Sequence, residues 1–189
     1  FEFVVMGDTR STEPVVLPEV FKQILREVNV LKPAFVVDTG DLILGGAAEG
    51  LGPQWDEFER VVGTCRVPFV PVPGNHDISD AGTERIYLER IGPTRFSFTY
   101  GNSLFIVLNT EEVGAIDRLS DGQNEWLRDQ LAQSDAKNIF LFMHQPHFTD
   151  PERWAKTADV LQGHPVRLVF GSHAHIYVDC GLREGVRYV

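Results

Sequence analysis

Five short apolar runs, each followed by a residue that can bind a metal, constrain this chain more than any other feature. The runs are bounded by Gly or Pro, which is typical of strands buried on both faces. They are residues 1–7 before Asp8, 34–40 before Asp41, 67–74 before Asn75 and His76, 139–143 before His144, and 166–172 before His173 and His175. In open α/β sheets, ligand sites gather beyond the carboxyl ends of the strands. Two Asp, one Asn and several His at such ends predict a metal centre.

The length and composition indicate one soluble globular domain. The chain has 189 residues, of which 43% are hydrophobic and 23% charged, both ordinary values. Its net charge of −10 argues against a nucleic-acid partner. No apolar stretch approaches the ~20 residues that span a membrane. Cys65 and Cys180 lack CxxC spacing and are expected as small core side chains.

The two ends of the chain carry little information about its processing. It begins at Phe1 without Met and ends at Val189 inside an expected strand. We therefore expect a single domain over residues 1–189 that lacks native residues at both ends. The sequence assigns neither a compartment nor an oligomeric state.

Amphipathic segments alternate with the apolar runs and predict helices. They are residues 17–28, 55–62 and 83–91, and two segments that begin with capping boxes at 120–123 and 149–152. Gly101-Asn102 lies between residues 96–100 and 104–108 and predicts a hairpin. Two mixed β-sheets packed face to face, with helices outside, accommodate both kinds of strand connection. The predicted fold class is a four-layer α/β/β/α sandwich.

Each candidate ligand also has an explanation that needs no metal. Asp8 and Asp41 are common residues of turns and helix caps. A histidine in an apolar strand, such as His144, is often a hydrogen-bonded core side chain, and His173 and His175 alternate along an expected strand. These explanations suit single residues and fail for the set, because five strand ends would then carry metal-binding residues by coincidence.

Two histidines and one glycine-rich segment lie outside the motifs. His147 and His164 are expected at the surface or in loops, with His147 as a contact of the pocket wall. Residues 45–52 contain no phosphate-binding motif, so we expect a mobile loop near the mouth of the site.

In chain order, the motifs are GD at residues 7–8, GD at 40–41, GNHD at 74–77, a lone His144, and SHAH at 172–175. This order resembles the calcineurin-like metallophosphoesterases, and the resemblance covers nearly the whole chain. GNHD is the most specific motif, whereas a single GD is weak. The family fold, a two-sheet sandwich flanked by helices, agrees with the pattern of strands and helices.

The resemblance implies a dinuclear centre of two divalent transition-metal ions, with Mn, Fe, Zn and Co as the candidates. Asp8 and His175 would hold the first ion, Asn75, His144 and His173 the second, and Asp41 would bridge them. A water shared by the ions would become hydroxide and attack phosphorus. His76 is the implied catalytic acid for the leaving group. Asp77 is expected to hold the His76 tautomer or to assist its charging.

The chain departs from the family at Arg10, where many members have the histidine of a DxH motif. Arginine stays protonated and cannot coordinate a cation, so the first ion is one ligand short. We expect Arg10, with Asn75, to bind the substrate phosphate, or else to pair with a carboxylate such as Asp38. A purely structural Arg–Asp pair is the alternative. Leu44 replaces the tyrosine of purple acid phosphatases, and Ser172 replaces the glycine of GHxH.

The predicted function is therefore metal-dependent hydrolysis of a phosphomonoester or phosphodiester, with a small phosphorylated substrate as the partner. The alternative is a catalytically impaired binding or scaffold protein with the same fold. Arg10 favours that alternative. The intact GNHD motif and both C-terminal histidines argue against it, since a protein without turnover is expected to lose Asn75 or His76.

Overall fold

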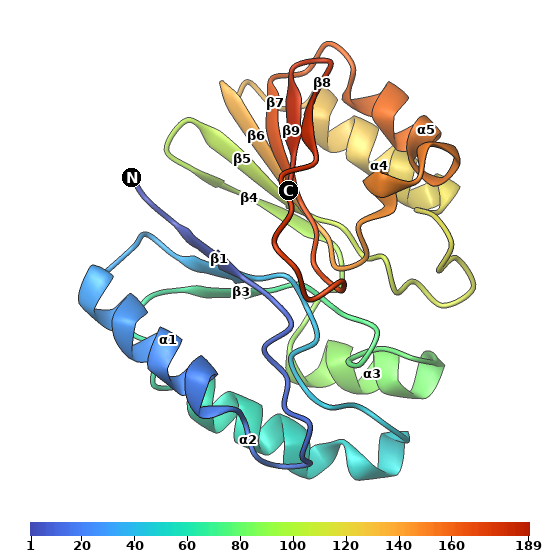
Figure 1. Cartoon of the computed structure of the whole chain (residues 1–189). Helices are drawn as coiled ribbons and strands as arrows, with labels where there is room; N and C mark the ends of the chain where they lie inside the picture. The colour runs from blue at the N-terminus through green and yellow to red at the C-terminus, as the bar shows by residue number, and fades with distance from the viewer. The chain divides into compact units, whose positions relative to one another are not determined.

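The computed structural model describes residues 1–189, which form two compact units, Phe1–Gly92 and Pro93–Val189 (Figure 1). Each unit contains one β-sheet and its own helices. Each also has its own cluster of buried apolar side chains. The two units are described separately below, and the single domain over residues 1–189 stays a prediction.

The first unit contains a three-stranded parallel sheet with strand order β1-β2-β3. The strands are β1 (Val4–Met6), β2 (Val36–Asp38) and β3 (Phe69–Pro71). The helices are α1 (Glu19–Leu31), α2 (Gly52–Val62) and α3 (Ala81–Arg90), with a 3-10 turn at Ala48–Gly50. Because all three strands run in the same direction, their carboxyl ends lie at one edge of the sheet.

The helices of this unit form because their apolar residues recur on one face. Phe21, Leu25 and Val28 are the buried residues of α1, at the spacing that a helix requires. In α2, the ring of Trp55 meets that of Phe58 edge to face at 5.7 Å between centroids. Such aromatic pairs add to the stability gained from burial alone.

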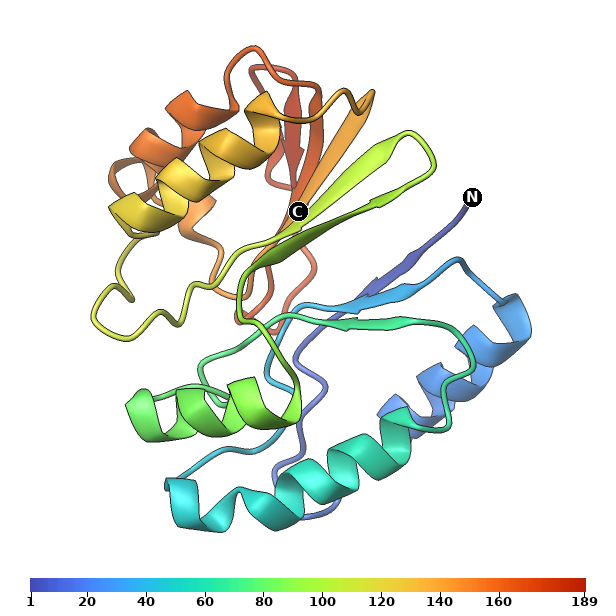
Figure 2. The same ribbon diagram turned by 180° about the vertical axis from the view of Figure 1, so that it is seen from behind.

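The second unit contains a six-stranded mixed sheet with strand order β4-β5-β6-β7-β9-β8. The strands are β4 (Phe96–Tyr100), β5 (Ser103–Val107), β6 (Asn138–Phe142), β7 (Val166–Phe170), β8 (Gly181–Arg183) and β9 (Val186–Tyr188). Helices α4 (Asp121–Ala132) and α5 (Pro151–Leu161) lie side by side along one face of the sheet (Figure 2). A 3-10 turn at His147–Thr149 precedes α5. The predicted hairpin is confirmed as β4–β5.

Both faces of the second sheet are apolar. Leu104 and Ile106 belong to the cluster that includes residues of α4 and α5. Phe105, between them, points to the opposite face because side chains alternate along a strand. Its ring stacks on Phe98 at 5.0 Å and on Phe140 at 5.2 Å. A sheet of this kind has to be covered on both faces, as the predicted sandwich class requires.

Two of the helix starts differ in detail from the capping boxes. Ser120 caps α4 as predicted, but the amide of Gln123 donates to the carbonyl of Asn109 and does not return to the cap. Asp150, and not Thr149, caps α5 by accepting N–H groups of the first turn. A carboxylate is at least as good a cap as a threonine hydroxyl, and Pro151 then takes the first helical position.

Each unit has the expected combination of a sheet and helices, with one refinement. The sheet of the first unit is parallel throughout, so mixed pairing is confined to the second. No helix is both long enough and apolar enough to cross a bilayer.

Candidate metal centre

The first unit brings the loops after its three strands together. The N–H of Asp8 donates to the carbonyl of Gly40 at 2.9 Å, and the N–H of Arg10 donates to the carbonyl of Asp41 at 2.8 Å. The N–H of His76 donates to Oδ1 of Asp41 at 3.0 Å. One carboxylate oxygen of Asp8 lies within 4.8 Å of one of Asp41. The strand-end residues of this unit therefore converge as the sequence predicted.

A buried carboxylate, Asp77, holds two of these loops. Its oxygens accept the N–H groups of Gly74 (2.8 Å), Asp41 (3.1 Å), Leu42 (2.8 Å) and Ile43 (3.1 Å). Burial raises the pKa of Asp77, and the N–H donors oppose that rise because they satisfy the ionised form. Asp77 does not hold the His76 tautomer as expected; it holds the backbone that carries the ligands.

Two glycines permit the close approach of these loops. A Cβ atom at Gly74 would lie 2.2 Å from the backbone nitrogen of Asp41. A Cβ atom at Gly45, which has a φ of +82°, would lie 2.3 Å from the carbonyl oxygen of His76. Gly45 is also joined to Gln54 by two hydrogen bonds of 3.0 Å. At Gly45, the glycine-rich loop is thus packed against the GNHD loop.

Arg10 pairs with Asp41, so the expected pairing with Asp38 is wrong. Its Nε donates to Oδ2 of Asp41 at 3.2 Å. Asp38 instead accepts the hydroxyl of Thr9 at 2.7 Å. Burial raises the pKa of Asp38 to about 7, against the Thr9 hydroxyl and the Gly40 N–H. Side chains alternate along an extended chain, so Thr9 and Arg10 face different carboxylates.

His76 is oriented by a backbone carbonyl. Its Nδ1 lies 2.6 Å from the carbonyl oxygen of Leu44, which can only accept, so Nδ1 carries the proton. Nε2 is then the atom that can hold or release a second proton, and it lies 3.9 Å from Oδ2 of Asp41. The side chain is 31% exposed, which leaves Nε2 accessible to a substrate.

The second unit brings two imidazoles together after β6 and β7. Nε2 of His144 lies 3.2 Å from Nδ1 of His173, with the two rings nearly perpendicular. Nδ1 of His144 lies 3.0 Å from the hydroxyl of Ser172. His144 is fully buried, whereas His173 and His175 are exposed and follow the end of β7 instead of continuing it. The two C-terminal histidines are therefore loop residues, and not alternating residues of a strand.

Backbone strain marks the candidate ligands in both units. Seven non-glycine residues have a positive φ, and four of them are candidate ligands. These four are Asp8 (54°), Asp41 (59°), His173 (69°) and His175 (54°). Such conformations cost on the order of 1–3 kcal/mol each and cluster at functional sites. The remaining packing of both units has to offset that cost.

Sequence reasoning missed Glu111 and misplaced His147. Glu111 is buried and accepts the amide of Gln145, the residue after His144, at 3.1 and 2.8 Å. The signal was present, because residues 104–108 are a further apolar run followed by polar residues. His147 is only 3% exposed, and neither ring nitrogen has a hydrogen-bond partner. Burial lowers its pKa, as does the charge of Arg153.

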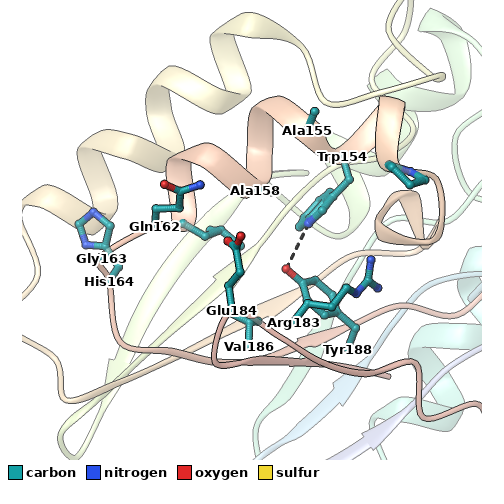
Figure 3. Close-up of a pocket in the computed structure, with 12 residues that line it drawn as sticks. Trp154, Ala155, Ala158, Gln162, Gly163, His164, Arg183, Glu184, Val186 and Tyr188 are labelled. Carbon is teal, nitrogen blue, oxygen red and sulfur yellow. Dashed lines mark hydrogen bonds between the residues drawn. The ribbon is translucent and has the colours of Figure 1, made fainter.

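A cavity of about 700 Å³ lies between α5 and the β8–β9 hairpin (Figure 3). The indole N–H of Trp154 donates to the hydroxyl of Tyr188 at 3.3 Å on its wall. The guanidinium of Arg183 lies 4.3 Å from the centre of the Tyr188 ring. His164 also lines the cavity, but none of the candidate metal ligands does. The cavity is therefore separate from the motif residues.

The donor sets of both units fit divalent ions. Two imidazole nitrogens bound to one tetrahedral ion at about 2.0–2.1 Å lie about 3.3 Å apart, close to the His144–His173 contact. Within the first unit, Asp8, Asp41 and Asn75 offer oxygen donors, a ligand type that divalent transition metals accept as well as nitrogen. Arg10 places a cation against Asp41 of this set.

Comparison with known proteins identifies the protein family. The Calcineurin-like phosphoesterase family matches residues 1–177. Serine/threonine-protein phosphatase CPPED1 of Pongo abelii is 30% identical over 181 residues, covering 82% of this chain and 58% of that protein. The 3',5'-cyclic adenosine monophosphate phosphodiesterase CpdA of Escherichia coli K12 is 25% identical over 148 residues, covering 77% of this chain and 52% of that protein.

A solved structure supports the fold. The crystal structure of a dimetal phosphatase from Danio rerio aligns with a TM-score of 0.72 at 15% identity, covering 98% of this chain and 85% of that one. The predicted metallophosphoesterase fold class is confirmed. The chain spans a little over half the length of the curated relatives given above. By these matches, the chain belongs to the calcineurin-like phosphoesterase family, whose enzyme class is the phosphoric ester hydrolases.

Proposed function

We propose that this chain carries the hydrolytic site of a metal-dependent phosphoric ester hydrolase. One observation carries the proposal: the loops after β1, β2 and β3 are joined by hydrogen bonds that gather Asp8, Asp41 and His76. Family membership supports it independently. A structural role alone would not require strained backbone at four candidate ligands.

Two divalent ions are the proposed cofactors. Following the family's motif order, Asp8 and His175 would hold the first, Asn75, His144 and His173 the second, and Asp41 both. When bound, the ions would supply positive charge for the phosphate and acidify the attacking water. Neutral imidazoles and an amide leave that charge largely intact, whereas a site built from carboxylates alone would cancel it.

His76 is the proposed general acid. The carbonyl of Leu44 holds a proton at Nδ1, so Nε2 faces the reaction and can deliver a proton to the departing oxygen. The N–H of His76 also fixes Asp41, so the acid and the proposed bridging ligand keep a constant separation. Asn75 and Arg10 are the proposed substrate-binding residues. The planar guanidinium of Arg10 forms a fork of N–H donors that can bind two phosphate oxygens at once.

The substrate is a small phosphomonoester or phosphodiester in this proposal. The two curated relatives are named for different reactions, a protein phosphatase and a cyclic-nucleotide phosphodiesterase. The family therefore supports both ester classes. A net charge of −10 disfavours a polyanionic nucleic acid.

The direct test is hydrolysis of p-nitrophenyl phosphate and of bis(p-nitrophenyl) phosphate by protein loaded with Mn²⁺. We expect turnover of at least one ester, loss of it after exhaustive chelation, and recovery when Mn²⁺ is restored. Turnover that survives chelation would contradict the metal requirement. No turnover of either ester by fully loaded protein would contradict hydrolysis.

The second candidate function is a binding or scaffold protein that keeps the fold without turnover. The specific observation in its favour is the Arg10–Asp41 ion pair, which engages the proposed bridging carboxylate. That candidate predicts phosphate binding by loaded protein with no release of p-nitrophenolate. The same assay, combined with a phosphate titration, separates the two functions.

A further inference from the structure

Arg10 is where the chain departs from its family's first motif, and it contacts the proposed bridging residue. Its Nε donates to Oδ2 of Asp41 at 3.2 Å. The Asp41 side chain is only 2% exposed and that of Arg10 is 18% exposed. The N–H of Arg10 also donates to the Asp41 carbonyl at 2.8 Å. The protein thus supplies a cation of its own to a buried carboxylate.

The two oxygens of Asp41 accept hydrogen bonds from different donors within the first unit, although the His76 ring nitrogen Nε2 also lies 3.9 Å from Oδ2. Oδ1 accepts the N–H of His76, which follows Asn75, the proposed ligand of the second ion. Oδ2 accepts Arg10, which lies two residues after Asp8, the proposed ligand of the first ion. Oδ2 is therefore on the side where the first ion would be held.

We propose that Arg10 and the first metal ion exchange at Oδ2 of Asp41. A buried carboxylate requires a counter-charge, which the guanidinium provides until the ion binds. Two cations at one oxygen repel each other strongly, so the ion displaces the guanidinium. The released planar fork then binds a phosphate oxygen of the substrate. This exchange rests on the proposed function, because it assumes the ion site.

If the exchange occurs, replacing Arg10 by an uncharged residue has two opposite effects, one on the stability of the ion-free protein and one on the affinity for the first ion. Removing the guanidinium deprives Asp41 of its counter-charge, which destabilises the ion-free protein. It also removes the competitor of the first ion, which raises the affinity for that ion. A purely structural ion pair, in which the guanidinium stays on Asp41 when the ion binds, leaves no fork free for phosphate, so the phosphate titration below distinguishes it from the exchange.

The experiment is a calorimetric titration of the intact chain with MnCl₂ without substrate. The variant is Arg10→Met, whose thioether is a poor ligand for a hard ion such as Mn²⁺. We expect the weaker of the two Mn²⁺ sites to tighten by about tenfold and the tighter site to stay within about twofold of the parent. Thermal melting should show a lower Tm for the ion-free variant and a larger rise on adding Mn²⁺.

Two further variants serve as controls. Arg10→Lys keeps the positive charge, so its weaker site should stay within about threefold of the parent. Arg66→Met removes an exposed arginine from the same unit and should change neither site. Equal Mn²⁺ affinities for the parent and Arg10→Met, or equal tightening in Arg10→Met and Arg10→Lys, would overturn the exchange.

A phosphate titration tests whether the guanidinium released from Asp41 binds phosphate. The comparison with Arg10→Lys changes the shape of the cation and keeps its positive charge. The Mn²⁺-loaded parent should bind inorganic phosphate about tenfold more tightly than loaded Arg10→Lys, which lacks the bidentate geometry. Equal phosphate affinities would overturn this step. A parent that binds no Mn²⁺ would overturn both the exchange and the proposed function. A parent that binds two ions and hydrolyses esters, with affinities insensitive to Arg10, would overturn the exchange alone.

Discussion

The two units present their candidate ligands by different means. In the first, Asp8 and Asp41 are carboxylates whose loops are joined mainly through backbone hydrogen bonds, several of which end on Asp77. In the second, the imidazole of His144 is positioned by the Ser172 hydroxyl and by a second imidazole.

The difference follows from charge. Carboxylates in a buried site repel one another, and the N–H groups and Arg10 beside them offset that repulsion. An imidazole that serves as a metal ligand is neutral and needs no counter-charge, so hydrogen bonds such as the one to the Ser172 hydroxyl orient the ring of His144. We therefore expect substitutions in the first unit to affect folding and chemistry together. Substitutions that reorient the candidate ligands of the second should affect metal affinity alone.

The largest expected effect is on the chemistry of the first unit. His76→Ala should lower kcat by about 10²–10⁴-fold while leaving metal content near normal, because it removes the proton donor and no ligand. Metal analysis and steady-state kinetics check both statements. A p-nitrophenolate leaving group, which needs little protonation, should recover part of the loss compared with a poor leaving group. Equal losses on both substrates would remove His76 from the acid role.

Asp77→Asn tests whether the first unit depends on its buried carboxylate. The amide turns an NH₂ group toward backbone N–H donors, so we expect a loss of about 3 kcal/mol in the free energy of unfolding. Urea unfolding followed by circular dichroism measures it. Asp135→Asn, at an exposed position, is the matched control and should be neutral. An unchanged stability would mean that Asp77 is already protonated.

Ser172→Ala tests the second unit by the same logic. Loss of the hydroxyl frees the His144 ring, and we expect metal affinity to fall by about tenfold with little change in stability. Zn²⁺ titration of the variant and parent, with Ser134→Ala as a control, measures the change. A loss of stability as large as that of Asp77→Asn would remove the distinction between the two units.

The smallest expected effect concerns His147. Its pKa is lowered from 6.5 in the folded protein, so below that pH the unfolded chain binds the proton and the folded chain resists it. The parent should therefore lose up to about 1 kcal/mol of stability relative to His147→Phe between about pH 7.5 and about pH 5.5. Parallel unfolding curves at the two pH values check this. A parent that gains stability on acidification relative to the variant would show that the sign is wrong.

Much of the candidate site was predictable from local sequence. The strand-end positions of Asp8, Asp41 and Asn75 were correct, because apolar runs and turn residues are local signals. The predicted partner of Arg10 was incorrect. Asp38 and Asp41 are close in sequence, and only the orientation of their side chains decides which one Arg10 contacts. The role of Asp77 was also missed, because backbone donors leave no trace in residue identity.

By itself, the sequence determined the order of the α-helices and of every strand except β8, the residue types of the candidate metal ligands, and the family. These follow from periodicity and from motifs that are read within a few residues. The tertiary structure alone decided that Glu111 and His147 are buried, that Ser172 meets His144, and that four candidate ligands adopt a left-handed backbone. Burial, strain and hydrogen-bond partners depend on segments distant in sequence, so packing within each unit had to set them.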